Sequence, residues 1–203
     1  MIASKQVGVF LIVSAPSGCG KTSIKNQLMK TGQFQFSVSY TTRKPREGEV
    51  DGQDYHFITV KAFEDKRASG GFLESAEVHG AFYGTGIETL ENLQKGQDVL
   101  LDIDIQGGTQ VKHKFSDSVS VFVLPPSWSA LQDRLQKRGT EEQSSVELRL
   151  NNAQEEILEY HKYDYLVVND SLEQAVDDII GIVNIEHKKT IRLEVDIDAF
   201  YKS

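Results

Sequence analysis

The strongest constraint on this sequence is a glycine-rich segment that lies between a buried-strand pattern and a helical pattern. Residues 7–13 form an apolar run, and helical periodicity begins at Lys21. The loop that joins them consists of Ala15, Pro16, Ser17, Gly18, Cys19, Gly20, Lys21 and Thr22. In this setting the glycines let backbone N–H groups turn toward phosphate oxygens, and the helix N-terminus adds a favourable dipole. We therefore expect this loop to bind the phosphates of a nucleoside triphosphate.

Four positions of the loop have individual interpretations. Lys21 is expected to reach the β- and γ-phosphates as a point charge, and the Thr22 hydroxyl is placed to coordinate Mg²⁺. Ala15 stands where the general pattern has glycine, which is a small change. Cys19 occupies a variable position, and we interpret it as a small filler instead of a reactive thiol. The alternative for the whole loop is an ordinary glycine-rich turn between a strand and a helix.

The rest of the chain alternates between strand and helix patterns. Apolar runs that suit strands buried on both faces occur at residues 7–13, 99–103, 119–124 and 165–168. Helical patterns occur at residues 21–30, 106–114, 127–138 and 172–187. This alternation predicts an α/β fold with a parallel sheet core flanked by helices.

The length of 203 residues indicates a single folding unit. Within it, two segments interrupt the alternation of strands and helices. Residues 37–95 read as an inserted lobe, and residues 127–159 read as a charged helical pair, broken near Gly139, that forms a mobile flap. The core is then expected to comprise residues 1–36, 96–126 and 160–203. Apolar residues alternate with charged ones near the end of the chain, at Ile191, Leu193, Val195 and Ile197. This pattern predicts a half-buried strand, for which we see no role.

Charge and cysteine content limit the function classes. The net charge of -8 would repel phosphate backbones and anionic membranes, so nucleic acid and membranes are unlikely partners. Clusters of Arg and Lys are correspondingly informative against this acidic background. The single cysteine excludes an internal disulfide framework and suits a reducing cytoplasm. The first residues resemble neither a signal peptide nor a membrane span, so we expect a soluble protein.

An acidic pair follows the apolar run at 99–103. Asp102 and Asp104 stand where a carboxylate partner for a phosphate-bound metal is expected, at the end of a buried strand. Asp102 is our candidate for the coordination shell of the metal, directly or through water. The alternative is that both aspartates only cap the helix that begins near Gln106.

A basic segment opens the inserted lobe. It reads Ser39-Tyr40-Thr41-Thr42-Arg43-Lys44-Pro45-Arg46. Arg43 and Arg46 are the better phosphate ligands because a guanidinium fork matches two phosphate oxygens at once, whereas Lys44 is expected to point to water. The alternative is a solvated basic turn.

Further motifs occur downstream, namely Phe72-Leu73-Glu74, Tyr83-Gly84-Thr85, Asp102-Ile103-Asp104, Arg138-Gly139 and Val168-Asn169-Asp170. In order and spacing, these motifs together with the loop and the basic segment resemble guanylate kinases, especially bacterial ones, over roughly residues 8–187. The resemblance implies a P-loop nucleoside monophosphate kinase fold with a mixed α+β GMP-binding lobe at 37–95 and a helical lid at 127–159. It also implies ATP- and Mg²⁺-dependent phosphorylation of GMP to GDP, or of dGMP to dGDP.

The resemblance also assigns roles by position. The GMP phosphate would be held by Ser39, Arg43, Arg46, Tyr55 and Tyr83. Guanine would be read by Glu74, Thr85 and Asp104. Catalytic cations would be Lys21, Arg43 and the lid residues Arg134, Arg138 and Arg149. Asn169 and Asp170 would lie near the adenine of ATP.

The chemistry of guanine agrees with these assignments. Its N1–H and 2-amino donors match a carboxylate such as Glu74, and a hydroxyl such as Thr85 can donate to O6. From the sequence alone, Glu74 would otherwise be an exposed strand glutamate, and Tyr55 and Tyr83 ordinary core or rim aromatics. Two other functions are weighed: a phosphopeptide-binding module of the same family, and a kinase for another phosphorylated small molecule such as a ribose bisphosphate. The oligomeric state is left open.

Overall fold

The centre of the fold is a five-stranded sheet whose neighbouring strands are all parallel. A computed structural model describes residues 4–78, 80–137 and 143–202. The strands lie in the order β10 (Tyr165–Val168), β9 (Val119–Leu124), β2 (Phe10–Ser14), β8 (Asp98–Asp102) and β3 (Phe34–Phe36). The four predicted core strands are therefore confirmed, as is the parallel sheet.

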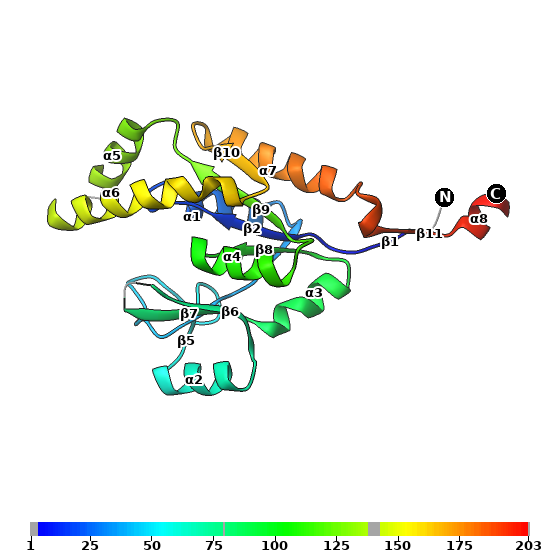
Figure 1. The fold of residues 1–203 in the computed structure, drawn as a ribbon, viewed down its shortest axis with the longest axis horizontal. Coiled ribbons are helices and arrows are strands. Elements are labelled where there is room, and N and C mark those ends of the chain that lie inside the picture. The colour runs from blue at the N-terminus through cyan, green and yellow to red at the C-terminus, as the bar shows by residue number, and fades with distance from the viewer. Residues whose placement is uncertain (1–3, 79, 138–142, 203) are drawn as a thin grey trace.

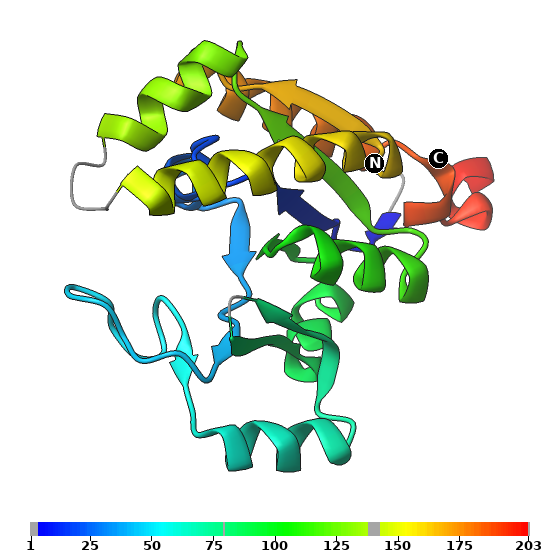
Figure 2. The same cartoon turned by 60° about the vertical axis from the view of Figure 1, so that its left-hand side comes forward.

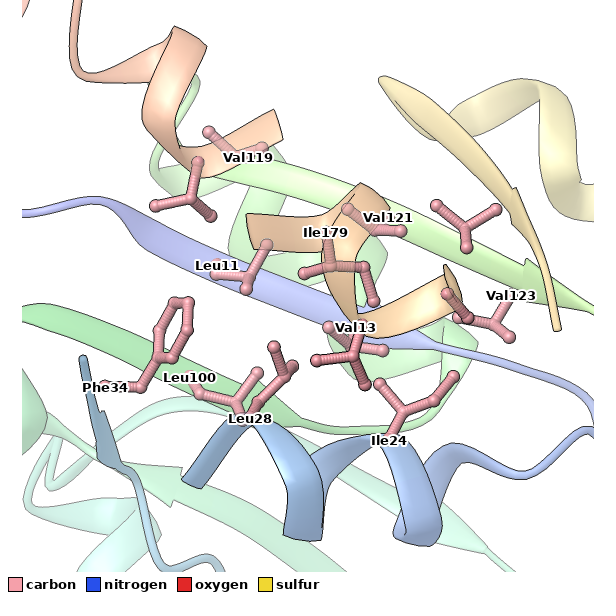
Figure 3. Close-up of a cluster of buried hydrophobic side chains, with 14 of the residues drawn as sticks. Leu11, Val13, Ile24, Leu28, Phe34, Leu100, Val119, Val121, Val123 and Ile179 are labelled. Carbon is pink, nitrogen blue, oxygen red and sulfur yellow. The ribbon is translucent and has the colours of Figure 1, made fainter. Parts of the chain in front are cut away.

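The apolar runs are continuous because both faces of the sheet are covered. Leu11 and Val13 of β2 face a cluster that includes helices α1 (Lys21–Lys30) and α7 (Leu172–Glu186), as Figure 3 shows. Phe10 and Ile12 belong to the cluster on the other face, which includes α4 (Ile105–Lys114) and α3 (Leu90–Gln94). Among the described residues, no helix is long and apolar enough to cross a membrane.

Side-chain caps set the starts of several helices. Asp104 accepts a hydrogen bond from Gly107 N at 2.8 Å and begins α4, one residue earlier than the pattern predicts. Ser127 accepts from Ala130 N at 3.1 Å, directly before α5 (Trp128–Lys137). Ser171 caps α7 in the same way. Each cap satisfies a backbone donor that the first helical turn leaves unpaired.

The inserted segment builds a second sheet below the core, visible in Figures 1 and 2. Its strands are β5 (His56–Phe57), β4 (Tyr40–Thr41), β7 (Ala81–Gly86) and β6 (Phe72–Val78). Pairs β4·β7 and β6·β7 are antiparallel and β4·β5 is parallel, so the sheet is mixed. Helix α2 (Val60–Ala68) covers it through Phe63, whose ring stacks on Phe72 and Phe82. A 3-10 turn, η1 (Ile87–Thr89), leads back to the core.

Two helices and a 3-10 turn occupy the predicted lid. They are α5, α6 (Gln143–Ile157) and η2 (Leu158–Lys162). Leu131 and Leu135 of α5 and Ala153 of α6 form a small buried cluster with Cys19 of the phosphate loop. The sequence led us to expect few apolar contacts here, whereas the structure packs both helices against the loop. The predicted break at Gly139 lies outside the described residues.

The end of the chain differs from its prediction. Only β11 (Leu193–Val195) is a strand, paired antiparallel with β1 (Ser4–Gln6). Ile191 lies in the 3-10 turn η3 (Thr190–Arg192) and Ile197 begins α8 (Ile197–Lys202), both exposed. The described pairing joins Leu193–Val195 to Ser4–Gln6, so periodicity over 191–197 predicted the strand too long. This ribbon projects from the core in Figure 1.

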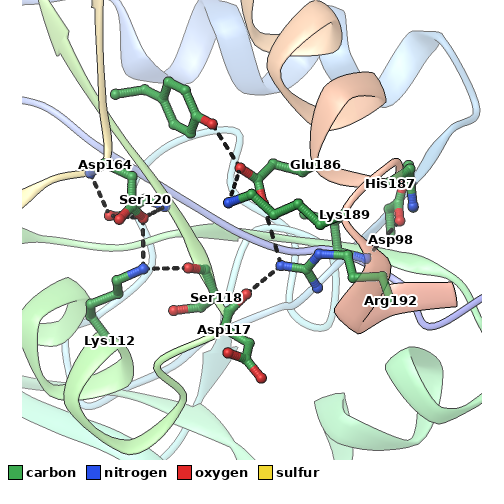
Figure 4. A network of polar contacts seen from close by, with 12 residues as sticks. Asp98, Lys112, Asp117, Ser118, Ser120, Asp164, Glu186, His187, Lys189 and Arg192 are labelled. Atoms are coloured by element: carbon green, nitrogen blue, oxygen red, sulfur yellow. Dashed lines mark hydrogen bonds and ion pairs between the residues drawn. The ribbon is translucent and has the colours of Figure 1, made fainter.

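A polar network joins the end of α7 to the start of β10, as Figure 4 shows. Buried Glu186 accepts hydrogen bonds from Tyr165 Oη and Lys189 Nζ, both at 2.7 Å, and lies 3.7 Å from Arg192. Although burial alone would raise the pKa of Glu186, these donors hold it below its ordinary value. The network compensates a buried charge that would otherwise be costly.

We predict that replacing Leu28 with alanine destabilises the core substantially. Leu28 is fully buried between α1 and the sheet, so its loss removes apolar contacts and leaves a cavity. The free energy of unfolding, measured by urea denaturation, should fall by about 2–5 kcal/mol. Ile185→Ala on α7, whose side chain is 66% exposed, is the control and should change it by less than about 0.5 kcal/mol. Equal effects of the two variants would contradict the assigned core.

Candidate functional site

A polar cavity of about 380 Å³ lies where the carboxyl ends of the core strands face the inserted lobe. The phosphate loop and α1 contribute Ser17, Lys21, Thr22 and Lys25. The end of β8 and the residues after it contribute Asp102, Ile103 and Asp104. The remaining lining residues, mostly from the lobe, are Phe36, Ser39, Arg43, Arg46, Glu49, Asp54, Tyr55, Glu74, Val78 and Tyr83. Eleven of the predicted site residues therefore border one space.

The phosphate loop is braced from the end of β10. Gly20 has a φ of 90°, which only glycine adopts readily, and a Cβ there would lie 2.3 Å from Asn169 Nδ2. That same nitrogen donates to Cys19 O at 2.8 Å. Asn169 is buried, so it holds the backbone turn that precedes α1. Asp170 follows at the exposed end of the strand.

The loop is also packed from the lid side. A Cβ on Gly18, whose φ is 92°, would lie 2.8 Å from Leu135 and 2.9 Å from Leu131. Ala15 contacts two apolar clusters, which explains why a methyl group is accommodated there. Cys19 is fully buried, and burial raises the pKa of its thiol to about 12. Its interpretation as a filler agrees with this environment.

Lys21 lies between the loop and the acidic pair. Its Nζ is 2.9 Å from Asp102 Oδ1 and donates to Ile103 O at 3.0 Å. The ammonium approaches Oδ1 as an ion pair and off the direction of a hydrogen bond, so this buried oxygen has no hydrogen-bond partner among the described residues. An anion on the loop would therefore compete with Asp102 for the lysine.

The donor set near the loop fits Mg²⁺. Thr22 presents an exposed hydroxyl at the cavity, and Asp102 stands beside Lys21. No cluster of three or more His, Cys, Asp or Glu residues suited to a metal occurs among the described residues. Mg²⁺ is commonly held by one or two protein oxygens plus phosphates and water, so a sparse oxygen set suits it better than a closed cage would.

The side chain of Arg43 is held by hydrogen bonds within the lobe. Its Nη1 and Nη2 donate to the two carboxylate oxygens of Glu49 at 2.9 and 2.8 Å, and its Nε donates to Tyr83 Oη at 3.2 Å. Its guanidinium also lies 5.4 Å from the centre of the Tyr55 ring. The hydrogen bonds that Arg43 donates to Glu49 raise the pKa of Arg43 and lower the pKa of Glu49.

Sequence reasoning did not include Glu49 in the site. Its Oε2 also accepts from Arg46 N at 2.7 Å, so it closes the turn that carries both arginines. The available signal was a carboxylate three residues after Arg46 within a basic segment. The side chain of Arg46 is exposed at the cavity, and Lys44 points to solvent as predicted.

Glu74 is a buried carboxylate that faces the cavity. Its side chain is only 4% exposed, so the alternative of an exposed strand glutamate is wrong. Thr85, on the neighbouring strand, donates to Glu74 Oε1 at 2.7 Å. Burial raises the pKa of Glu74 to about 7, opposed by the Thr85 hydrogen bond and reinforced by the charge of Asp104. Asp104 both caps α4 and lines the cavity, whereas Asp102 caps no helix.

Two of the three arginines predicted in the lid contact the phosphate loop or the residue that braces it. Arg149 donates from Nε and Nη2 to Ser17 Oγ at 3.1 and 2.6 Å, which places it beside the phosphate loop. Arg134 Nη2 donates to Asn169 O at 2.9 Å. Arg138 lies outside the described residues. Neither Arg134 nor Arg149 lines the cavity described above.

Comparison with known proteins identifies the family. A family model described as "Guanylate kinase" matches residues 8–186, which is most of the chain and includes every part of this cavity. The chain belongs to the guanylate kinase family. The resemblance inferred from the motifs is thereby confirmed.

Guanylate kinases from several bacteria align over most of the chain. The protein of Nitratidesulfovibrio vulgaris is 49% identical over 174 residues, covering 85% of this chain and 84% of that protein. That of Clostridium tetani is 44% identical over 191 residues, covering 94% and 92%. That of Thermotoga maritima is 45% identical over 195 residues, covering 95% and 94%.

A solved guanylate kinase shares the architecture. The crystal structure of guanylate kinase from Anaplasma phagocytophilum aligns with a TM-score of 0.79 at 36% identity, covering 93% of this chain and 91% of that one. The predicted P-loop nucleoside monophosphate kinase fold, with a parallel core and a mixed second sheet, is confirmed.

We predict that Cys19 is nearly inert toward thiol reagents in the folded chain. With its pKa raised from 9.0 to about 12, the thiolate fraction at pH 8 should fall by roughly 10²–10³, and burial adds a steric barrier. Labelling with a chromogenic disulfide reagent should therefore be at least about 100-fold slower than in the urea-unfolded chain. The chain has one cysteine, so the signal is unambiguous. Labelling at the unfolded rate would show that the cluster around Cys19 is open.

Proposed function

We propose that this chain phosphorylates GMP to GDP, and also dGMP to dGDP, by direct in-line transfer from ATP, which leaves as ADP. The observation that carries the proposal is the single cavity that joins a phosphate loop to a buried carboxylate. The loop side suits a triphosphate, and the lobe side suits a monophosphate with a guanine base. Family membership supports the same reaction.

Guanine recognition is proposed to depend on Glu74. In its ionised form the carboxylate accepts from both N1–H and the 2-amino group, while Thr85 and Asp104 stand beside it. Adenine offers an acceptor where guanine has N1–H, so it would leave the buried carboxylate unpaired. Burial thus raises the cost of the wrong base.

The GMP phosphate is proposed to bind Arg43, Arg46, Tyr55, Tyr83 and Ser39. In the described structure, Glu49 accepts two hydrogen bonds from Arg43, so its carboxylate stands in for an anion and holds the guanidinium in the pocket. Tyr83 orients the Nε side of the same group. A doubly charged phosphate at the pocket would then meet an arginine that is already positioned.

Transfer is proposed to depend on position and positive charge. Lys21 would exchange Asp102 for phosphate oxygens, and Arg134, Arg138 and Arg149 would neutralise charge on the transferring group. The acceptor is an anionic phosphate oxygen, so no side chain has to act as a nucleophile. Thr22, with Asp102 nearby, would hold Mg²⁺, which would supply positive charge to the phosphates. Closure of α5 and α6 over the loop would exclude water.

Two other functions fit the site less well. A phosphopeptide-binding module would have no use for the loop with Lys21 or for Arg149 beside it. A kinase for a ribose bisphosphate would have no need to bury Glu74 against Thr85.

The small-molecule substrates ATP and GMP, together with a single free cysteine, suit the cytoplasm.

A panel of nucleoside monophosphates tests the proposal directly. GMP and dGMP should be phosphorylated in a coupled ADP-release assay, with kcat/KM higher than for AMP, CMP and UMP by about 10⁴, because mismatched bases leave Glu74 unpaired. Equal turnover of AMP would contradict the guanine assignment. Absence of turnover with every monophosphate would contradict the kinase activity itself.

The pH dependence of GMP binding provides a second test. Because the pKa of Glu74 is raised to about 7 in the free protein, the accepting carboxylate is depleted below pH 7 and fully present above pH 8. GMP affinity, measured by calorimetry, should fall as pH is lowered from 8 to 6, approaching about tenfold per unit below the pKa.

Two variants separate this effect from titration of the GMP phosphate. Glu74→Gln should bind GMP weakly at every pH and keep only the shallow dependence that comes from the phosphate. Glu77→Gln, on an exposed position of the same strand, should behave like the unmodified chain. A Glu74→Gln profile as steep as that of the unmodified chain would remove Glu74 from the explanation.

A further inference from the structure

Two side chains of α4 hold strand β6 on either side of Glu74. Gln110 Nε2 donates to Ser75 O at 3.1 Å, and Gln110 Oε1 accepts from Ser75 N at 3.4 Å. One turn further along the helix, Lys114 Nζ donates to Leu73 O at 2.5 Å. The residues that flank Glu74 in the sequence are therefore the ones whose backbone is bound to the core helix.

These contacts matter because β6 is an edge strand. It pairs only with β7 in its sheet, whose order is β5-β4-β7-β6. The backbone groups of Ser75 and of Leu73 O face away from β7, where an edge strand has no ladder partner. Gln110 supplies both a donor and an acceptor to one residue, as a neighbouring strand would. Figures 1 and 2 show α4 lying between the core sheet and this strand.

The same helix also limits where the Glu74 carboxylate can lie. A Cβ on Gly107 would be 2.8 Å from Glu74 Oε2, so the carboxylate touches the first turn of α4. Asp104 caps that turn and lines the cavity. Lys114, at the other end of the helix, lowers the pKa of Glu74 through its charge and so opposes the effect of burial. Helix α4 thus holds the backbone on both sides of Glu74, limits the position of its carboxylate and contributes to the electrostatic potential there.

The phosphate-binding turn is fastened differently. The hydrogen bonds given above for Arg43 and Glu49 join residues of the lobe to one another. The guanine side of the lobe is therefore tied to the core by side chains of α4, and the phosphate-binding turn is held by contacts inside the lobe.

We propose that Gln110 is a positioning residue for guanine selection, which acts by clamping β6 to α4 so that Glu74 meets N1–H and the 2-amino group of the base. Lys114 completes the clamp on the other side. The proposal rests on the proposed function, because it concerns the same base-binding carboxylate. Gln110 itself makes its contacts to the backbone of β6 and not to the cavity.

Gln110→Leu tests the clamp, because leucine keeps a similar volume and removes both hydrogen bonds. Amide hydrogen exchange at Ser75 should become at least about tenfold faster, since the edge N–H loses its acceptor. KM for GMP should rise about tenfold, while KM for ATP and kcat change less than about twofold. The preference for GMP over inosine monophosphate, which lacks the 2-amino group, should shrink.

Thr109→Ala is the matched control. Thr109 is the exposed neighbour on the same helix, and its hydroxyl donates to Ile105 O at 2.9 Å, one turn earlier in α4. This variant should leave Ser75 exchange and both KM values unchanged. The thermal unfolding midpoint of each variant shows whether the fold is intact. A loss of stability in Gln110→Leu with unchanged base preference would assign Gln110 a purely structural role and overturn the proposal.

A double-mutant cycle tests whether Gln110 acts through Glu74. In a Glu74→Gln background, Gln110→Leu should cause little further loss in the preference for GMP over inosine monophosphate. Fully additive losses would overturn the proposal, because the two residues would then act independently. Failure of the proposed function is recognised separately, since the unmodified chain would then show no guanine preference, whereas the Ser75 exchange measurement does not depend on any activity.

Discussion

The pairing of β2 with β8 is the constraint on which the site depends. Val13 lies opposite Asp102 in this parallel ladder, so the loop after β2 and the acidic residues after β8 emerge at the same edge of the sheet. The ion pair of Lys21 with Asp102 spans the two segments. Because parallel strands bring their carboxyl ends together, residues about 80 positions apart meet without any long loop reaching between them.

The lobe side of the cavity is organised around a buried carboxyl group. Glu74 is almost completely buried, and among the described residues its side-chain hydrogen-bond partner is the hydroxyl of Thr85 and not a cation. A carboxylate in this environment is costly when ionised, which is why its pKa rises to about 7. A base with two adjacent donors would relieve that cost. Part of the free energy of binding would then come from pairing a carboxylate that is unfavourably buried in the free protein. Arg43 is the opposite case, because Glu49 already accepts hydrogen bonds from both Nη1 and Nη2 of its guanidinium.

Much of the core was predictable from the sequence, and much of the lobe was not. The boundaries of β9, β10 and α1 agree with the predicted ranges, because apolar residues that face both sides of a buried sheet leave a continuous run. The burial of Glu74 has no local sequence signal, because apolar and polar residues do not alternate strictly along β6 and so do not show which side chains are buried. Glu49 makes side-chain hydrogen bonds within its own turn, and Gln110 contacts a strand 35 residues away; periodicity reports neither. The division into core, lobe and lid at residues 37, 96, 127 and 160 stays a prediction.

The burial of Cys19 under Leu131 and Leu135 limits how freely the phosphate loop could be exchanged between proteins. Loops of this kind are often treated as portable cassettes, because their backbone geometry recurs on many scaffolds. Here Cys19, at the variable position of the loop, is also part of the buried cluster that packs against α5. A transplanted loop with a larger residue at position 19 would need a matching reduction in α5, so the two segments form one unit of sequence design.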